Sequence, residues 1–295
     1  MKLKCVIMAL TLAWAPAIFS EAYADGNNLG AEKLEPVVGQ VHVISVHVAD
    51  HECFDAVFLF LRDVLRLPLV YGTLSKPNNP QERLYAGFSV GNAYLEPCGP
   101  YPSDAPFSAD RPARFHGLTF SPATTLSAGE GELSRRKIEH SGIYGSGTMP
   151  KFIYISDASL TGKMLAVSFW EVLNTEDRVN LGFLSSSLQQ AKGGTLGVRC
   201  IEEVRIGFPG KDDLETWNNF LKPARREGSV CHVGNGPVLR FIPANEARID
   251  SIVLKVGSLA KAKSVLHEQN LVGKQTADGL EVDVTKACGL RIVLK

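Results

Sequence analysis

The sequence has no excess of charge of either sign, because Lys plus Arg and Asp plus Glu both number 31 in 295 residues. No basic cluster or acidic run departs from this balance, which argues against nucleic acid and anionic membrane surfaces as partners. The chain also lacks a Walker loop, a dinucleotide-binding fingerprint and a nucleophile elbow. These absences disfavour nucleotide-dependent chemistry and serine hydrolysis.

Cysteine is scarce and widely spaced. The six cysteines include no CxxC pair, so neither a zinc knuckle nor a dithiol redox pair is encoded. We interpret the five that follow Cys5 as buried small hydrophobic residues, although one disulfide stays open in an oxidising compartment. These five are Cys53, Cys98, Cys200, Cys231 and Cys288.

Only one long apolar run occurs, and it lies at the start of the chain. Val6–Phe19 follows the positive residues Lys2 and Lys4 and precedes the small-x-small sequence Ala22-Tyr23-Ala24. This arrangement predicts a signal peptide over residues 1–24. We therefore expect an exported, periplasmic or secreted protein with no membrane association after the signal is removed.

The chain does contain a unit that it repeats four times: a short apolar strand, an amphipathic helix and further short strands. The first copy opens with Val41–Val48 and the last with Ile249–Val256. Hydrophobic periodicity and turn residues predict the four helices over residues 52–65, 131–140, 212–221 and 259–269.

We predict an α+β protein in which four βαβββ modules pair into two cupped mixed-sheet domains. The first domain is expected over residues 38–175, after a polar linker over residues 25–37. The second domain is expected over residues 197–295. Residues 176–196 are polar and rich in Gly and Ser, and we interpret them as the connector.

Paired units of this kind, with a carboxylate on a closing strand as in Tyr94-Leu95-Glu96, resemble the vicinal oxygen chelate superfamily. That group contains glyoxalase I, the extradiol ring-cleaving dioxygenases and the fosfomycin and bleomycin resistance proteins. The resemblance covers nearly all of residues 38–295. It implies that two modules close a cupped sheet and that a divalent metal ion lies inside the cup.

The resemblance places metal ligands on the opening and closing strands of each module. His116 stands just before an apolar strand, and Glu96 and Glu171 end two closing strands, so we expect these three to bind metal. Glu96 and Glu171 should then be symmetry mates, with Glu171 also a catalytic base. The alternative is that Glu171 caps a strand end and Ser168 holds the position inside the cup.

The fourth ligand is ambiguous. By the spacing typical of the superfamily it falls on Val43, which cannot bind metal. Strand alternation places Val43, Ser45 and His47 on one face. Either a bulge brings His42 into the cup, or His47 serves further along, or this ligand is lost.

The second pair of modules has different residues at these positions: Glu203, Ser251, Arg240 and Arg291. Arginine offers only hydrogen-bond donors and cannot bind a cation. Two interpretations are open. The second domain is degenerate, with its arginines neutralised by Glu202 and Glu203, or Arg240 and Arg291 form a substrate pocket for an anion.

We therefore expect a metal-dependent lyase, isomerase or oxygenase that uses Fe, Mn, Ni or Zn on a small oxygenated molecule. A ring-cleaving dioxygenase is disfavoured, because the second domain lacks the ligands such enzymes carry there. The alternative is a metal-free protein of the bleomycin-resistance type, which sequesters a small molecule between aromatic walls that include Tyr94, Phe169 and Trp170. Either form is expected as a monomer or homodimer.

Overall fold

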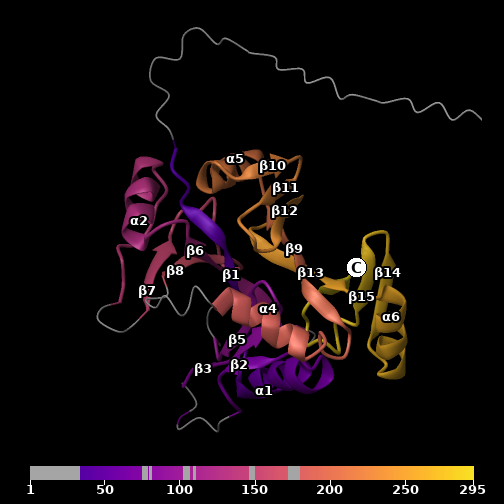
Figure 1. Cartoon of the computed structure of the whole chain (residues 1–295). Coiled ribbons are helices and arrows are strands. Elements are labelled where there is room, and N and C mark those ends of the chain that lie inside the picture. Colours follow the sequence, from indigo (N-terminus) through magenta and orange to yellow (C-terminus); the bar gives the residue numbers. More distant parts are fainter. Residues whose placement is uncertain are drawn as a thin grey trace, which may run out of the picture. The chain divides into compact units, whose positions relative to one another are not determined.

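Strands and helices alternate along the chain as the four-copy pattern predicts (Figure 1). The structure is a computed structural model, and it describes residues 34–74, 79, 82–101, 107–108, 111–145, 150–171 and 180–295. The predicted signal peptide, residues 25–33 of the predicted linker and residues 176–179 of the predicted connector lie outside these ranges. Leu34–Lys295 forms one compact unit.

The first sheet has eight strands in the order β2-β4-β5-β1-β6-β8-β7, with β3 paired to β5. At its centre β1 runs antiparallel to β6, and each of these strands has a parallel neighbour, β5 beside β1 and β8 beside β6. The bounds are β1 Val38–Val48, β2 Leu69–Tyr71, β3 Leu84–Tyr85, β4 Gly87–Ser89, β5 Tyr94–Gly99, β6 Ala113–Pro122, β7 Lys151–Ile155 and β8 Ala166–Glu171.

The second sheet repeats this plan in the order β10-β11-β12-β9-β13-β16-β15-β14. Here β9 and β13 form the central antiparallel pair, with β12 and β16 as their parallel neighbours. The bounds are β9 Val198–Phe208, β10 Arg225–Glu227, β11 Val230–His232, β12 Val238–Pro243, β13 Arg248–Val256, β14 Val272–Thr276, β15 Gly279–Val282 and β16 Ile292–Leu294. The predicted fold class, two cupped mixed sheets built from four modules, is confirmed.

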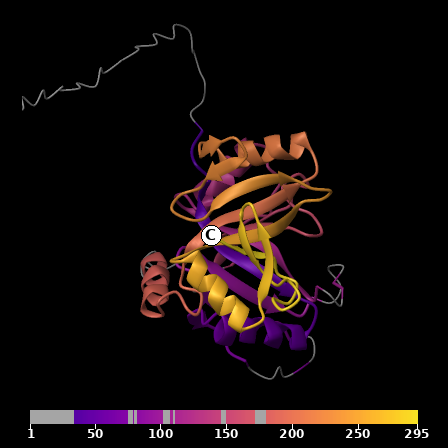
Figure 2. The ribbon, with the colours of Figure 1, turned by 90° about the vertical axis from the view of Figure 1, so that its right-hand side faces the viewer.

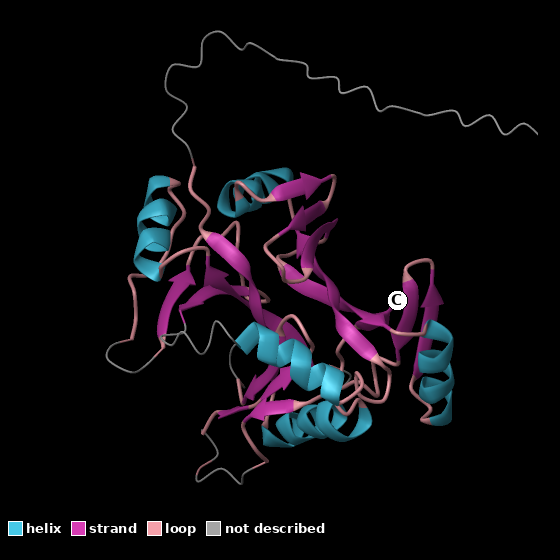
Figure 3. Cartoon of the chain, in the orientation of Figure 1, coloured by secondary structure: helices cyan, strands magenta, loops and turns pink. Residues whose placement is uncertain are grey.

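One helix follows the opening strand of each module, as shown in cyan in Figure 3. Their bounds are α1 His51–Leu59, α2 Leu126–Arg135, α5 Lys211–Leu221 and α6 Leu259–Glu268, and a π-helical segment, η1 Phe60–Val64, extends α1. The side chains of Asp50, Thr125 and Ser258 each accept a hydrogen bond from a main-chain N–H in the first turn of the helix that follows. Figure 2 shows α6 beside β14 and β15, which it contacts.

Two helix predictions are wrong. The second helix begins at Leu126, five residues before the predicted start, because Thr125 caps it by accepting a hydrogen bond from Ala128 N at 3.2 Å. The predicted connector contains helix α4, Asn180–Gln190, where no helix was expected. Its Ser- and Gln-rich sequence gives only a weak amphipathic pattern, so hydrophobic periodicity did not predict this helix.

Among the described residues, none of the helices combines the length and apolar character needed to cross a membrane.

The core lies on the helix side of the sheets. Along β1, Ile44 and Val46 are fully buried in the same cluster as Phe54 and Phe58 of α1, as strand alternation predicts. Val43 points to the other face, where it belongs to a separate small cluster. The concave face of the first sheet is therefore set apart from the main core.

A buried arginine joins the two halves of the chain. The side chain of Arg136, next to the end of α2, is 1% exposed. Its Nη1 donates to the carbonyl oxygens of Asn219, Phe220 and Lys222, at 2.7, 3.1 and 3.0 Å. These carbonyls lie at the C-terminal end of α5, where a cation is favoured by the helix dipole. This contact helps to hold α2 against α5.

Candidate functional site: the concave face of the first sheet

Two histidines occupy matching positions at the centre of the first sheet. Pairing between β1 and β6 shifts register between Val41 and Val43 and between Ser45 and Val46. The residue left without a direct partner is His42 in β1 and His116 in β6. Because the two strands are antiparallel, a two-fold rotation exchanges these bulges. The bulge foreseen as one way to bring His42 to the concave face is present.

The same symmetry gives Glu96 a partner, but it is not the one predicted. Glu96 lies beside Ser45 in the β1–β5 ladder, and Ser168 lies beside Thr119 in the β6–β8 ladder. The two-fold rotation that exchanges His42 and His116 also exchanges Ser45 and Thr119. It therefore exchanges their neighbours on the closing strands, Glu96 and Ser168. The symmetry-related pair on the closing strands is therefore Glu96 and Ser168, not Glu96 and Glu171.

Glu171 faces away from this site, which corrects its predicted catalytic and metal-binding roles. It follows Trp170 on β8, so strand alternation puts the two side chains on opposite faces. Its Oε1 accepts a hydrogen bond from Leu126 N, in the first turn of α2, at 3.0 Å. A carboxylate is stabilised there by the helix dipole. Glu171 is a structural cap.

Glu96 is held by two hydroxyl groups. Tyr71 Oη donates to its Oε2, and Ser45 Oγ lies 3.5 Å from its Oε1. Burial raises the pKa of Glu96, while these two hydrogen bonds act in the opposite direction. Its carboxyl group therefore keeps its proton to a higher pH than an exposed glutamate does, and a protonated carboxyl can donate a hydrogen bond to a ligand oxygen.

His47 also reaches the concave side, at the far end of β1. Its ring stacks on Tyr101, with centroids 3.8 Å apart and 3° between planes, and lies 3.9 Å from the ring of His116. The guanidinium carbon of Arg83 lies over the ring of Tyr101, 4.3 Å from its centroid. Burial, followed by the charges of His116, Arg114 and Arg83, lowers the pKa of His47 to about 2. His47 is thus a neutral imidazole inside a planar stack.

The ring of His42 belongs to a different group. It makes edge contacts with Tyr94 and Trp170, at centroid distances of 5.3 and 5.2 Å. His42 is 5% exposed and Tyr94 is 4% exposed. Both predicted substrate aromatics, Tyr94 and Trp170, are therefore brought together with His42, while His47 pairs with His116.

The group around His42 is part of a longer aromatic row. Trp170 stacks on Phe152 at 5.9 Å, Phe152 on Tyr154 at 6.2 Å, and Tyr154 meets Tyr144 at 6.0 Å. At the other end Tyr94 lies 6.0 Å from Tyr71, the residue that binds Glu96. We define the aromatic row by these members: Tyr144, Tyr154, Phe152, Trp170, His42, Tyr94 and Tyr71. Tyr144 is 58% and Tyr154 51% exposed, so the row runs from solvent to the half-buried Glu96.

Sequence reasoning missed four of the seven members of this row, Tyr71, Phe152, Tyr154 and Tyr144, and misplaced one further ring. Phe152 and Tyr154 pair with Trp170 and Ser168, and alternation along residues 151–155 could have placed them on the same face. Phe169, which was expected in the aromatic wall, points to the helix side. There it contacts Phe220 of α5 at a centroid distance of 5.8 Å.

Helix α4 covers one part of the concave face. Leu184 is fully buried and packs with Val43 and Tyr94. Its carbonyl oxygen accepts a hydrogen bond from Ser89 Oγ at 2.7 Å. Figure 1 shows α4 lying across the first sheet near β1 and β5. The covered part contains the buried end of the aromatic row, while Tyr154 and Tyr144 lie at its exposed end.

The side chains do not form the metal site that the sequence predicts. Across the described ranges, no three His, Cys, Asp or Glu side chains converge closely enough to hold a metal ion. His47 and His116 overlap ring to ring, which does not direct their nitrogen atoms at one point. Gly117 pairs with Ser45, whose side chain fills the space beside it, and Ser168 replaces a second carboxylate. The described residues, in this arrangement, do not form a site for a resident divalent metal.

The second sheet carries ion pairs where the first carries rings. Glu203, 4% exposed, accepts hydrogen bonds from Arg240 at 2.8 and 2.9 Å and from Lys295 at 3.2 Å. These bonds, Arg240 first, lower the pKa of Glu203 to about 2. Arg205 lies 3.4 Å from the same carboxylate. The predicted neutralisation of Arg240 by Glu203 is thus present, and the same carboxylate also neutralises Arg205.

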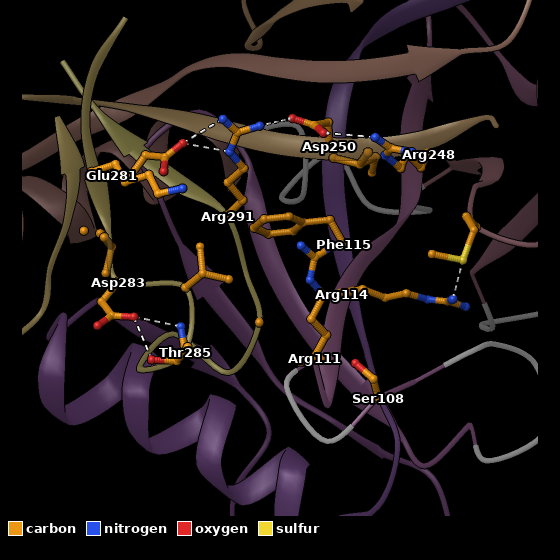
Figure 4. A pocket seen from close by; sticks show the side chains of 18 of the residues that line it. Ser108, Arg111, Arg114, Phe115, Arg248, Asp250, Glu281, Asp283, Thr285 and Arg291 are labelled. Atoms are coloured by element: carbon orange, nitrogen blue, oxygen red, sulfur yellow. Dashed lines mark hydrogen bonds and ion pairs between the residues drawn. The ribbon is translucent and has the colours of Figure 1, made fainter. Parts of the chain in front are cut away.

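Arg291 is engaged by other acids than those predicted. It bonds to Asp250 at 2.8 Å and to Glu281 at 2.7 Å (Figure 4). Glu202, the expected partner, lies 3.8 Å from Lys295 instead. Arg240 and Arg291 as substrate-binding residues stay predictions, but each is committed to a carboxylate here.

Comparison with known proteins identifies the fold through structure alone. No protein-family model matches the chain, and no curated protein matches its sequence. A mutant of homoprotocatechuate 2,3-dioxygenase from Brevibacterium fuscum aligns over 88% of this chain and 71% of its own, with 13% identity and a TM-score of 0.52. The Mn(II)-bound glyoxalase from Novosphingobium aromaticivorans aligns over 88% and 82%, with 11% identity and a TM-score of 0.54.

A dioxygenase and a glyoxalase of this architecture are members of the vicinal oxygen chelate superfamily. With two eight-stranded sheets of the same internal plan, this chain has the two-domain fold of the vicinal oxygen chelate superfamily.

Proposed function

We propose that this protein binds a small planar, oxygen-bearing aromatic molecule on the concave face of the first sheet, without a metal ion. The observation that carries this proposal is the aromatic row, which leads from the exposed Tyr144 and Tyr154 to Tyr71 and the half-buried Glu96. A flat ring gains stacking energy on such a surface. Glu96 supplies a polar group that can bond to a ligand oxygen.

Tryptophan fluorescence tests this proposal. Trp170 belongs to the aromatic row, Trp217 is fully buried in α5 and Trp14 lies in the predicted signal peptide. The probe is 4-nitrocatechol, which is planar, quenches tryptophan emission and has two adjacent oxygens that a metal would chelate. Quenching should persist in Trp217→Phe and be lost in Trp170→Phe. Equal quenching in both variants would overturn the assignment of the site.

Affinity measured by calorimetry gives a second readout. Tyr154→Ala removes an exposed ring of the row and should weaken probe binding several-fold, since one aromatic contact is worth about 1 kcal/mol. The matched control is Tyr85→Ala, which removes a tyrosine of similar exposure, 45%, outside the row. Binding should be unchanged by a chelator and by added Mn²⁺.

The alternative is the divalent-metal-dependent lyase, isomerase or oxygenase that the sequence predicts. It is favoured by one observation: the symmetry-related His42 and His116 lie on the same sheet as Glu96, in a fold shared with a Mn(II)-bound glyoxalase. Elemental analysis of protein purified without chelators decides between the two. Stoichiometric Fe, Mn, Ni or Zn that disappears in both His116→Ala and Glu96→Ala would establish the metal-dependent alternative and overturn metal-free binding.

We further propose that the protein works outside the cytoplasm, in the periplasm or the medium, with a small molecule as its partner. Support comes from the charged, apolar and small-residue segments of residues 1–24. Mass spectrometry of the exported protein should show a chain that begins at Asp25. A protein that keeps residues 1–24 and stays with the cells would contradict this proposal. Sedimentation would distinguish a monomer from a homodimer.

A further inference from the structure

A cavity of about 790 Å³ lies apart from the aromatic row, where the beginning of β6 meets the second sheet. Its walls come from Arg111 to Phe115 on one side and from β13, β14, β15 and the segment before β16 on the other. This volume lies within the range of pockets that enclose small organic molecules. Figure 4 shows side chains from both walls, with Arg291 between Glu281 and Asp250 on one wall and Arg114 directed at Met164 on the other.

Cationic side chains outnumber acids around this cavity. Its lining contains five cations, Arg111, Arg114, Arg248, Lys274 and Arg291, and three acids, Asp250, Glu281 and Asp283. All three acids are engaged by the protein itself. Arg291 bridges Asp250 and Glu281, and Asp283 accepts hydrogen bonds from the main-chain N–H and the hydroxyl of Thr285 at 2.9 and 2.7 Å.

Two of the cations remain available to a ligand. Within the described ranges, neither Arg111 nor Lys274 forms an ion pair. In Figure 4 the guanidinium group of Arg111 points into the cavity toward Phe115. A guanidinium group in this position can hold a carboxylate through two parallel hydrogen bonds.

Apolar side chains form part of the remaining wall, beside the hydroxyl groups of Ser108, Thr276 and Thr285. Phe115 is 4% exposed, Ile249 is 5% exposed and Val282 is fully buried. A free inorganic anion would gain nothing from these side chains, whereas an apolar body attached to an anionic group would bury its surface against them. The charge and the apolar wall together select an amphipathic anion.

We propose that this cavity is a second binding site, which takes a small organic carboxylate with a planar apolar body. Arg111 and Lys274 bind the carboxylate, while Phe115 and Ile249 pack against the body. Arg291 serves to hold Asp250 and Glu281 in place and to keep these acids from repelling the ligand. The site depends neither on a metal ion nor on the aromatic row.

Calorimetry with 2-naphthoate and its neutral counterpart 2-naphthamide tests this proposal on the purified protein. Naphthoate should bind at least tenfold more tightly than the amide, because only the acid uses the cations. Arg111→Gln should weaken naphthoate binding by about tenfold and leave the amide unaffected, and Lys274→Gln should weaken it less. Both residues lie at the surface and form no ion pair with any described residue, so these variants should fold normally.

Two controls separate this site from other cationic surfaces and from the aromatic row. Arg199→Gln removes an exposed arginine outside the cavity and should not change naphthoate binding. Trp170→Phe disrupts the aromatic row, which itself takes planar oxygen-bearing rings, so it should remove only a binding step that naphthoate and naphthamide share. The naphthoate step that is lost in Arg111→Gln should be unchanged in Trp170→Phe. The proposal is overturned if naphthoate shows no binding at millimolar concentration, if Arg111→Gln binds it as the wild type does, or if Trp170→Phe abolishes that same step.

Discussion

In the first sheet the two bulged residues of the central strands are His42 and His116, whereas the equivalent residues of the second sheet are Glu202 and Asp250. The closing strands differ in the same way: Arg240 in the second sheet occupies the position of Glu96 in the first. One backbone plan thus carries an uncharged, aromatic concave face and an ion-paired one.

The difference shows that the stability of this fold requires neither an aromatic concave face nor an ion-paired one. Strand pairing and the helix-side core are common to both sheets. The concave faces are consequently free to diverge. We expect substitutions on them to have unequal effects, because a buried charge that loses its partner costs far more than a neutral group that loses one hydrogen bond.

The largest effect should come from the ion-paired face. Glu203→Leu leaves Arg205 and Arg240 without their shared carboxylate, in a place where Glu203 and Arg205 are 4% and 7% exposed. Removing one partner of a buried ion pair costs about 3–5 kcal/mol of unfolding free energy. Urea denaturation of the variant and the wild type measures it. A triple variant with Arg205→Leu and Arg240→Leu added should recover much of this loss, and if it does not, the cost has another origin.

The two faces should also respond to pH with opposite sign. The pKa of Glu203 is lowered from 4.5 to about 2, so its stabilising effect is present above pH 4.5 and is lost as the pH falls toward 2. This shift corresponds to about 3 kcal/mol at neutral pH. The pKa of Glu96 is raised by burial, so the folded protein holds a proton that the unfolded chain releases, and stability declines as the pH rises above 4.5.

Melting temperatures of Glu203→Gln and Glu96→Gln, measured against the wild type from pH 3 to pH 8, test this difference. The cost of Glu203→Gln should grow with rising pH. Glu96→Gln mimics the protonated carboxyl and should become more favourable, relative to the wild type, over the same interval. Two curves with the same slope would show that the faces do not differ in this respect.

The fold could be predicted from the sequence, because each module contains its own apolar strand and amphipathic helix, which local periodicity reveals. The apolar strand at residues 41–48 and the amphipathic helix that follows are defined by periodicity within a few residues. Two-module pairing then follows from the need to bury the apolar face of each unit. The helix of the second module was misplaced by five residues, because the sequence prediction did not take Thr125 as its N-cap.

The site was harder to predict, because it depends on register between strands far apart in the sequence. A one-residue slip turns a side chain to the other face. Glu171 and Trp170 are neighbours, yet only Trp170 reaches the concave side, and no local pattern distinguishes them. His42 reaches the same side only through a bulge that forms against β6, more than seventy residues away. The resemblance to a superfamily with metal sites could not show that Ser168 stands at the position symmetry-equivalent to Glu96, or that Gly117 stands at the position equivalent to Val43.

A smaller effect should follow from filling the space at the centre of the first sheet. A Cβ atom added to Gly117 would lie 2.9 Å from both Cβ and Oγ of Ser45. Gly117→Ala should therefore cost about 1–3 kcal/mol through overpacking. The double variant Ser45→Gly/Gly117→Ala should be more stable than the sum of its parts predicts, as a double-mutant cycle by urea denaturation would show. In the second sheet the equivalent pair, Arg205 and Ser251, has room for both side chains, so Ser251→Ala should cost less.

The smallest effect should come from the uncharged face. Tyr71→Phe keeps the ring but removes the hydroxyl that donates to Glu96, so it should cost about 1 kcal/mol at neutral pH. Because that hydrogen bond lowers the pKa of Glu96, the variant should raise this pKa further and hold its carboxyl proton more tightly. Tyr154→Phe, which removes a hydroxyl from a half-exposed ring of the same row, is the matched control and should be neutral. A Tyr71→Phe protein as unstable as Glu203→Leu would mean that Glu96 is charged and dependent on its donors, and that the two concave faces are more alike than their residues suggest.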